Sequence, residues 1–141
     1  MSAPILTAQA LPTWVAVRDH LRGRYELDDE DDDMVSLTLA LPERDRTQLV
    51  RVHHSTDSRE VPWIELRTAV CRTEHLKPED ALAENASLPF GTFGLIDDEY
   101  DLEYRFPLRA LTTARLDGLL RRIARDGDAL EAHYTGGADE Y

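Results

Sequence analysis

The residues of this chain that could do chemistry are above all its clustered carboxylates. They occur as the run DDEDDD at residues 28–33, as the triplet 97–99, and as Asp126 with Asp128. A catalytic pair of carboxylates needs one member whose pKa is raised by burial or by a close like charge. All three clusters fall in segments that we expect to be loops or helix ends, where water keeps carboxylates ionised. The sequence therefore predicts solvated charges here and assigns no catalytic residue.

Metal binding is the second chemistry that these side chains suggest. The calcium loop of an EF-hand needs glycine at its sixth position and glutamate at its twelfth. Counted from Asp28, those positions are Asp33 and Leu39, so the acidic run does not match. His53 and His54 are adjacent, and adjacent residues on a strand point to opposite faces, so they cannot readily hold one ion. We expect no metal site and no cofactor.

Nucleophilic catalysis would have to use Cys71 or a serine. His75 follows Cys71 by four residues, but a catalytic cysteine needs surroundings that stabilise its thiolate, and the nearby Arg72 and Glu74 offset each other. No serine stands in a Gly-x-Ser-x-Gly context. The glycines of GTFG, at 91–94, lack the lysine of a phosphate-binding loop. We therefore predict a buried or edge thiol and a protein without enzymatic activity.

The net charge limits the partners that we expect. The chain has 141 residues, which is the size of one domain. Its 28 acidic and 16 basic side chains give a formal net charge of −12, which opposes binding to nucleic acid and favours a basic or amphipathic partner. No apolar run is long enough to span a bilayer, so we expect no membrane contact either.

Cysteine content and the first residues indicate a cytoplasmic protein. A single cysteine forms no intrachain disulfide, which fits a reducing compartment. The start, MSAPILTAQALPTW, has neither the basic region nor the long apolar stretch of a secretory signal. One lysine among 16 basic residues, beside abundant Ala, Leu and Asp, indicates a bacterial genome rich in G and C.

Hydrophobic periodicity predicts the elements that carry these residues in the first half. Apolar residues recur near every 3.6 positions over 11–24, which predicts a helix. The run at 28–33 is expected to be a solvated loop because six like charges repel one another. Alternating segments at 35–41, 47–55 and 63–71, separated by short polar turns, predict three strands of an antiparallel meander.

The second half predicts a short helix, a hairpin and a long helix. Proline and two acidic residues favour a helix start within 76–91. Strands at 92–96 and 102–108 flank an acidic turn. Thr112 or Thr113 caps a last helix to about His133, in which leucine and isoleucine form one stripe.

This order, α-β-β-β-α-β-β-α, predicts one α+β domain with helices packed on an antiparallel sheet. We place the domain at residues 11–133. The flanking segments, 1–10 and 134–141, are predicted to be a flexible amino-terminal arm and a flexible tail.

The sequence also resembles a known fold. The stretch ENASLPFGTFGLIDDEYDLEYRFPLRALTTARLDGLLRRIARDGDAL, preceded by LPTWVAVRDHLRGRY and the predicted strands, is similar in element order to the type III secretion chaperone-like fold, which includes the YbjN family. The resemblance covers about residues 11–133. It implies a small acidic cytoplasmic protein, usually a homodimer, without enzymatic activity. It further implies a dimer face on the helix at 78–87 and the strand from Thr92.

From the resemblance and the charge we predict a chaperone-like protein that dimerises and binds a partner polypeptide. The residues assigned to the partner are Leu11, Trp14, Val15, Leu37 and Leu39, because Trp is favoured at interaction hot spots.

Two other functions remain open at this point. One is a signalling or stress regulator of the YbjN type, which binds a folded partner. The other is an acidic inhibitor, such as an immunity protein against a basic toxin, with residues 28–33 as the contact.

Overall fold

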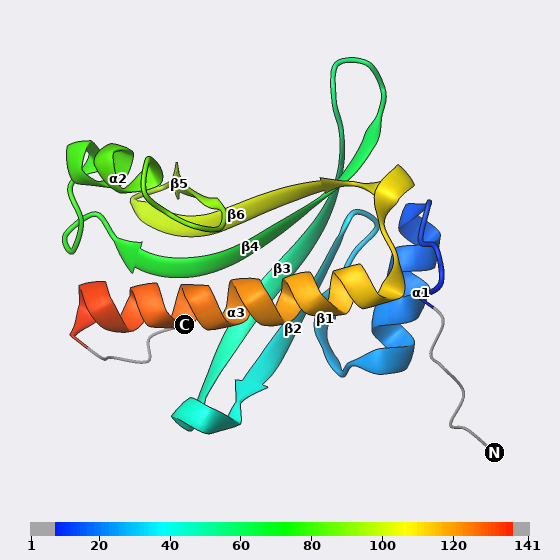
Figure 1. The fold of residues 1–141 in the computed structure, drawn as a ribbon, viewed down its shortest axis with the longest axis horizontal. Helices are drawn as coiled ribbons and strands as arrows, with labels where there is room; N and C mark the ends of the chain where they lie inside the picture. The colour runs from blue at the N-terminus through cyan, green and yellow to red at the C-terminus, as the bar shows by residue number, and fades with distance from the viewer. Residues whose placement is uncertain (1–7, 137–141) are drawn as a thin grey trace.

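The computed structural model describes residues 8–136 and shows one antiparallel sheet with helices on one face (Figure 1). In chain order the elements are α1 (Trp14–Arg24), β1 (Leu27–Glu30), β2 (Met34–Leu41), β3 (Arg46–Thr56), β4 (Pro62–Arg72), α2 (Pro78–Asn85), β5 (Thr92–Ile96), β6 (Glu99–Pro107) and α3 (Thr113–Thr135). Two 3-10 turns, Pro42–Arg44 and Leu108–Ala110, follow β2 and β6. The six strands lie in the order β1-β2-β3-β4-β6-β5. The α+β class and the antiparallel sheet are confirmed.

The acidic run is the first place where the structure differs from the prediction. Its first half belongs to the short edge strand β1, so four strands, rather than three, lie between the first two helices. The run can join the sheet because β1 is an edge strand and because its charges are partly compensated. Thr38 donates to Asp28, and Arg22 donates to Glu30 from α1. Charged residues on an edge strand also discourage pairing with another chain.

The helix ends follow from capping. Thr13 Oγ1 accepts from the backbone N–H of Ala16 at 3.2 Å, so α1 begins at Trp14 and not at residue 11. Thr112 Oγ1 accepts from Arg115 N at 3.2 Å and caps α3, which is one of the two predicted caps. At its far end α3 continues through Thr135 to Gly136, whose φ of 73° is left-handed.

Part of each segment that was predicted to be flexible lies within the described residues. Gln9 exchanges hydrogen bonds with Thr113, and Ala10 forms a β-bridge with Thr112, so the end of the predicted arm is fixed beside α3. The first two residues of the predicted tail belong to α3. The other predicted flexible residues, 1–7 and 137–141, lie outside the described residues.

The sheet divides between its two central strands. Backbone pairing of β3 with β4 runs from Thr56–Pro62 to Arg51–Arg67 and then stops. Beyond that point Gln48 Nε2 donates to Thr68 Oγ1 at 2.7 Å, and Thr68 Oγ1 donates to the carbonyl of Leu49 at 2.7 Å. Figure 1 shows β2 and β3 turning away from β4 and β6, with α3 lying across both halves. Side chains therefore bridge the strands where the backbone does not.

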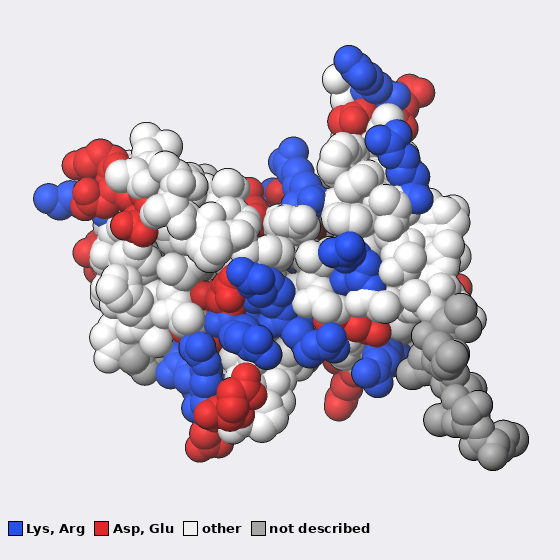
Figure 2. Space-filling model, viewed as in Figure 1, with Lys and Arg blue, Asp and Glu red and all other residues white. Residues whose placement is uncertain are grey.

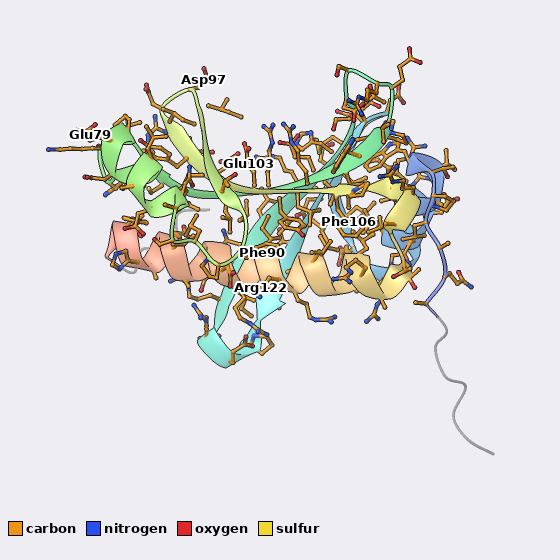
Figure 3. The ribbon with its side chains drawn as sticks, turned by 45° about the horizontal axis from the view of Figure 1, so that its top comes forward. Glu79, Phe90, Asp97, Glu103, Phe106 and Arg122 are labelled. Atoms are coloured by element: carbon orange, nitrogen blue, oxygen red, sulfur yellow. The ribbon has the colours of Figure 1, made fainter. Side chains whose placement is uncertain are left out.

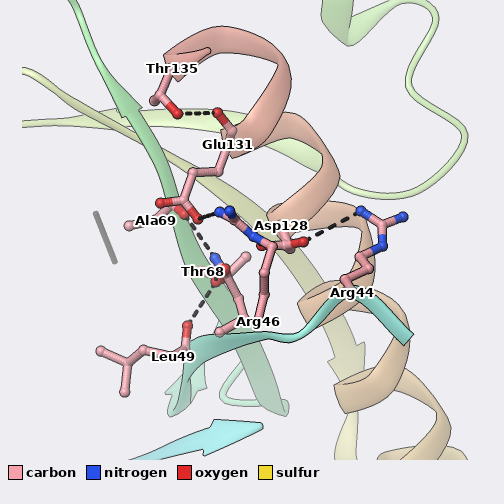
Figure 4. A network of polar contacts seen from close by, with 9 residues as sticks. Arg44, Arg46, Leu49, Thr68, Ala69, Asp128, Glu131 and Thr135 are labelled. Carbon is pink, nitrogen blue, oxygen red and sulfur yellow. Dashed lines mark hydrogen bonds and ion pairs between the residues drawn. The ribbon is translucent and has the colours of Figure 1, made fainter. Parts of the chain in front are cut away.

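Helix α3 meets this gap with a glycine and two buried carboxylates. A Cβ on Gly127 would lie 2.3 Å from Thr68 Cγ2, so only glycine allows this approach. Next to it, Arg46 donates to Asp128 and lies 3.5 Å from Glu131, while Arg44 lies 3.4 Å from Asp128 (Figure 4). Both carboxylate side chains are fully buried. The prediction that Asp128 is solvated is therefore wrong, because Arg46 reaches it from β3.

The apolar core fills the space between the sheet and α1 with α3. Its largest fully buried apolar side chains come from α1, β2, β4, β6, α3 and the turn between β6 and α3: Tyr100, Leu21, Leu37, Ile64, Leu66, Leu102, Leu108, Leu111, Leu116, Leu120 and Ile123. The inward stripe of α3 is the one that its sequence periodicity predicts. The opposite face of the sheet carries no helix (Figure 3).

Replacing Arg46 by Met should unfold the protein more easily than replacing Arg44 by Met. Arg46→Met leaves buried carboxylates without their main cation, which costs about 3–5 kcal/mol of unfolding free energy. Arg44 is more exposed, so Arg44→Met should cost about 1 kcal/mol or less. Urea unfolding of both variants measures the difference. Equal losses would mean that the Arg46 pairs contribute nothing beyond a surface ion pair.

Candidate functional site

The structure does not bring the five predicted partner-binding residues together on an exposed surface. Leu11, Trp14 and Leu37 are buried in the core, and Leu39 packs against it half-buried. Val15 alone among the five is well exposed, at 60%. Four of the five side chains are taken up by the chain's own core, so the five do not form the exposed partner surface that was predicted.

Trp14 illustrates the correction. Its ring stacks on His54 at a centroid distance of 5.5 Å, and its Nε1 donates to the carbonyl of Asp32 at 2.7 Å. The indole thus has an apolar contact and a satisfied N–H, as a buried tryptophan requires. Trp14 closes the core near the acidic turn and leaves no surface for a partner.

The large apolar side chains that are exposed lie mainly elsewhere, on α2 and β5. Leu82 of α2 is 72% exposed, and Leu95 and Ile96 of β5 are 48% and 44% exposed. They make three of the four such residues in the described part of the chain, Val15 being the fourth. Helix α2 packs beside β5, which is the last strand of the sheet. We name Leu82, Leu95 and Ile96 the apolar edge.

Backbone geometry leaves part of this edge open. The β5–β6 hairpin turns at Asp97 and Asp98, whose φ values of 48° and 65° fit a two-residue type I′ turn. In such a hairpin Ile96 and Glu99 form a hydrogen-bonded pair, and hydrogen-bonded and non-hydrogen-bonded pairs alternate from there along the two strands. Phe93 and Leu95 therefore stand in non-hydrogen-bonded pairs, and their N–H and C=O groups point away from β6. Asn85 covers the first of these, accepting from Phe93 N at 2.7 Å. The peptide groups of Leu95 are left on the outer side.

Carboxylates surround the apolar edge. Helix α2 carries Glu79, Asp80 and Glu84, and the hairpin tip carries Asp97 and Asp98, all exposed. Figure 2 shows acidic side chains gathered over α2, and Figure 3 places Asp97 at the hairpin tip. These charges are solvated, as the sequence predicted for the hairpin turn. Leu95 and Ile96 are adjacent and point to opposite faces of β5, so a segment added at this edge could contact one of them on each face. The surrounding carboxylates suit a segment with apolar side chains and basic flanks.

The open face of the sheet holds a second group of polar residues. Glu65 is buried and accepts from Arg67 at 2.8 and 3.1 Å, while Arg67 also lies 3.6 Å from Glu103. Beside them is a hollow of about 320 Å³ lined by Arg51, His53, Arg67, Arg72, Ile96, Asp97, Glu99 and Asp101. The Glu65–Arg67 pair lies within β4, whereas Arg67 and Glu103 join β4 to β6, and such a cross-strand pair of opposite charges stabilises the sheet.

Asp101 is the unusual member of this hollow. Its side chain is 6% exposed, and its Oδ1 finds no hydrogen-bond partner among residues 8–136. Its neighbours across the sheet, Ala69 and Gly94, are too small to supply one. Burial, helped by the charge of Glu99, raises the pKa of Asp101 to about 6. Sequence reasoning missed it because the predicted strand began at residue 102, although the alternation of Tyr100, Leu102 and Tyr104 extends further back.

The other candidate groups are placed as single residues. Cys71 is fully buried, which agrees with the predicted buried or edge thiol, and burial raises the pKa of this thiol to about 11. His53 and His54 point to opposite faces as predicted, with His54 stacked on Trp14 and His53 lining the hollow. Burial lowers the pKa of His53. Across residues 8–136 no three metal-ligating side chains gather into one group.

No protein-family model matches the chain, and no curated protein matches it. The family resemblance of residues 11–133 therefore stays a prediction. None of the helices in residues 8–136 is both long and apolar enough to cross a bilayer.

Replacing Asp101 by Asn should stabilise the protein at neutral pH. The folded pKa of about 6 lies above the unfolded value near 3.9, so the wild type loses stability as pH rises from about 4 to 6. Asn carries no such charge, so Asp101→Asn should gain about 2 kcal/mol at pH 7.5 and nothing at pH 4. Urea unfolding at both pH values tests this, with the exposed-site variant Asp19→Asn as control. A gain that is the same at both pH values would contradict a raised pKa.

Proposed function

We propose that this protein binds another polypeptide at the apolar edge and has no enzymatic activity of its own. The observation that carries the proposal is the contrast between the two edges of the sheet. On the β1 edge Asp28, Asp29 and Glu30 place carboxylates where a foreign strand would have to pair. On the β5 edge Leu95 and Ile96 are apolar, and the outward peptide groups of Leu95 are open. Natural proteins often block edge strands against pairing, and among residues 8–136 a side chain occupies the outer peptide groups of β5 at Phe93 and not at Leu95.

The partner that fits this edge is an extended segment with apolar side chains and basic flanks. An added strand would pair with the outer peptide groups of β5, and its apolar residues would cover the edge. The acidic rim of α2 and the hairpin would attract lysine or arginine on either side. A specific interface buries about 800 Å² per partner, so the segment would also extend over α2. This assignment keeps the predicted binding function and moves it from α1 and β2 to α2 and β5.

Self-association uses the same surface in the proposed scheme. The resemblance implies a dimer face on α2 and β5, and two copies could pair edge to edge. Their acidic rims would then meet, and like charges across an interface oppose binding. Salt distinguishes a second copy from a basic partner. Screening strengthens a contact between two acidic rims and weakens a contact between an acidic rim and a basic segment.

We also propose a cytoplasmic location for this protein. Its single cysteine is a free, buried thiol, which fits a reducing compartment.

Serine at positions 95 and 96 should remove most of the binding. The probe is a fluorescein-labelled twelve-residue peptide in which valine and leucine alternate with lysine. Leu95→Ser/Ile96→Ser should weaken binding at least ten-fold, because it removes the apolar side chains and keeps every charge of the protein. Val15→Ser, which removes an exposed apolar residue on α1, should change the affinity less than two-fold. Fluorescence anisotropy gives the affinities, and light scattering after gel filtration gives the oligomeric state.

Three results would decide against the proposal. The double serine variant could bind as tightly as wild type, Val15→Ser could weaken binding equally, or the peptide could fail to bind at millimolar protein. A dimer that tightens with salt and dissociates in the double serine variant would show that the edge serves self-association instead of a client.

A further inference from the structure

Four of the 15 arginines of this acidic protein lie along the outer face of α3. Arg115, Arg121, Arg122 and Arg125 line a groove between α3 and the segment before β5, together with Phe90, Tyr104, Thr112, Ala114, Gly118 and Leu119. The groove has a volume of about 700 Å³. Figure 2 shows basic side chains along α3 across the middle of this face, and Figure 3 shows Phe90 and Arg122 close together there. We name these residues the arginine groove.

Two of the four guanidinium groups have no acidic partner. Among residues 8–136, Arg115 and Arg121 form no ion pair within 4 Å, whereas Arg122 pairs with Asp126 at 2.7 Å and Arg125 lies 3.8 Å from Glu43. Arg122 and Arg125 are exposed, so these two ion pairs contribute little to stability. A carboxylate of a ligand could readily replace Asp126 or Glu43. In a chain of net charge −12, carboxylates are abundant, yet the groove is left with an excess of positive charge.

Aromatic rings hold the guanidinium groups in place. The Arg122 guanidinium lies over the Phe90 ring at 5.1 Å, and Phe90 stacks on Tyr104 at 4.4 Å. The Arg115 guanidinium lies over Phe106 at 5.8 Å. A guanidinium group that lies over an aromatic ring can still donate hydrogen bonds from its edge. Its side chain is already restricted before a ligand binds. The groove therefore presents ordered donors before any ligand arrives.

Small and apolar residues lie between Arg115 and Arg122 in the groove. Gly118 stands on the same helical stripe as Arg115, Arg122 and Arg125, and a Cβ built on it meets nothing within 4 Å. Leu119 and Ala114 complete the floor. The missing side chain opens room for an apolar group of a ligand, with guanidinium groups on either side.

We propose that the arginine groove binds an acidic segment of another protein that carries an apolar side chain among its carboxylates. Residues 115 to 125 span about 15 Å of helix, which about five residues of an extended chain would match. Guanidinium groups pair with carboxylates through two parallel hydrogen bonds. A nucleic acid is the weaker candidate, because its phosphate charge continues beyond the groove and would be repelled by a chain of net charge −12. This surface is separate from the apolar edge and opposite to it in charge.

A labelled acidic peptide tests the groove. The probe is a fluorescein-labelled twelve-residue peptide of glutamate and aspartate with one leucine and one phenylalanine, titrated with full-length protein in 50 mM NaCl. Arg115→Gln/Arg121→Gln should weaken its binding at least ten-fold. Arg59→Gln/Arg72→Gln removes the same two charges at exposed positions outside the groove, and it should change the affinity less than three-fold. Circular dichroism melting checks that both double variants remain folded.

Glycine substitutions give an independent comparison. Gly118→Glu fills the open space at this position and adds a negative charge, so it should abolish binding of the acidic peptide. Gly23→Glu makes the same change on α1, where a Cβ also meets nothing within 4 Å, and it should have little effect.

Four outcomes would overturn the proposal. The acidic peptide could fail to bind at millimolar protein, the two arginine pairs could matter equally, or Gly118→Glu could bind as well as Gly23→Glu. The fourth is a labelled twelve-nucleotide oligothymidine that binds more tightly than the peptide and loses its affinity in Arg115→Gln/Arg121→Gln, which would make the groove a nucleic-acid site.

Discussion

The fold depends on how α3 is fixed across a sheet that divides. Backbone pairing between β3 and β4 ends at Arg51–Arg67, so the two halves of the sheet are not joined by hydrogen-bonded strands beyond it. The contact of Arg46 with Asp128 and Glu131 joins β3 to α3 at this gap, and the Gln48–Thr68 hydrogen bond joins β3 to β4. Burying these charged groups costs more free energy than burying apolar residues of similar size would. In return, each carboxylate hydrogen-bonds the guanidinium in one specific geometry. The polar contact therefore defines one position of α3 along the sheet.

The surfaces of the molecule follow from that position. With the leucine and isoleucine stripe of α3 turned to the sheet, its arginines must face outward beside Phe90 and Tyr104. Helix α1 covers the other half, where Arg22 and Arg18 approach Glu30 of β1. Both helices lie on one face, which leaves the β5 edge and the open face of the sheet to solvent. Basic and acidic side chains are thus concentrated on different elements. The net charge of the whole chain therefore does not describe the charge of the arginine groove or of the apolar edge.

Local patterns predicted the elements well and the contacts between them poorly. Periods of 3.6 and 2 indicated α3, β3 and β4 to within one or two residues, because one face of each is apolar. Strand β1 was not predicted, because a run of six acidic residues is typical of a solvated loop. Its pairing with β2 is a tertiary contact that this local pattern does not indicate. Asp128 and Glu131 lie on the inward side of α3, but their partner Arg46 is 82 residues away from Asp128 in sequence, and no local pattern links them.

The candidate site was missed for a related reason. In the sequence, four large apolar residues stand in similar periodic segments: Trp14, Leu37, Leu82 and Leu95. What separates them is whether another element covers them. Leu37 lies on β2, between two strands and beneath helices, whereas Leu95 lies on the last strand of the sheet. Which strand is last depends on β6 inserting between β4 and β5, and this order is set by long-range pairing.

One short segment connects the two proposed surfaces. Phe90 lies in the arginine groove, and Thr92 begins the strand that carries the apolar edge. Between them Gly91 has a φ of 74°, and a Cβ there would lie 2.7 Å from the carbonyl oxygen of Glu103. No other residue type allows the chain to turn this closely over β6. The direction in which β5 leaves the groove is therefore fixed by backbone sterics, and this one turn joins the arginine groove to the apolar edge.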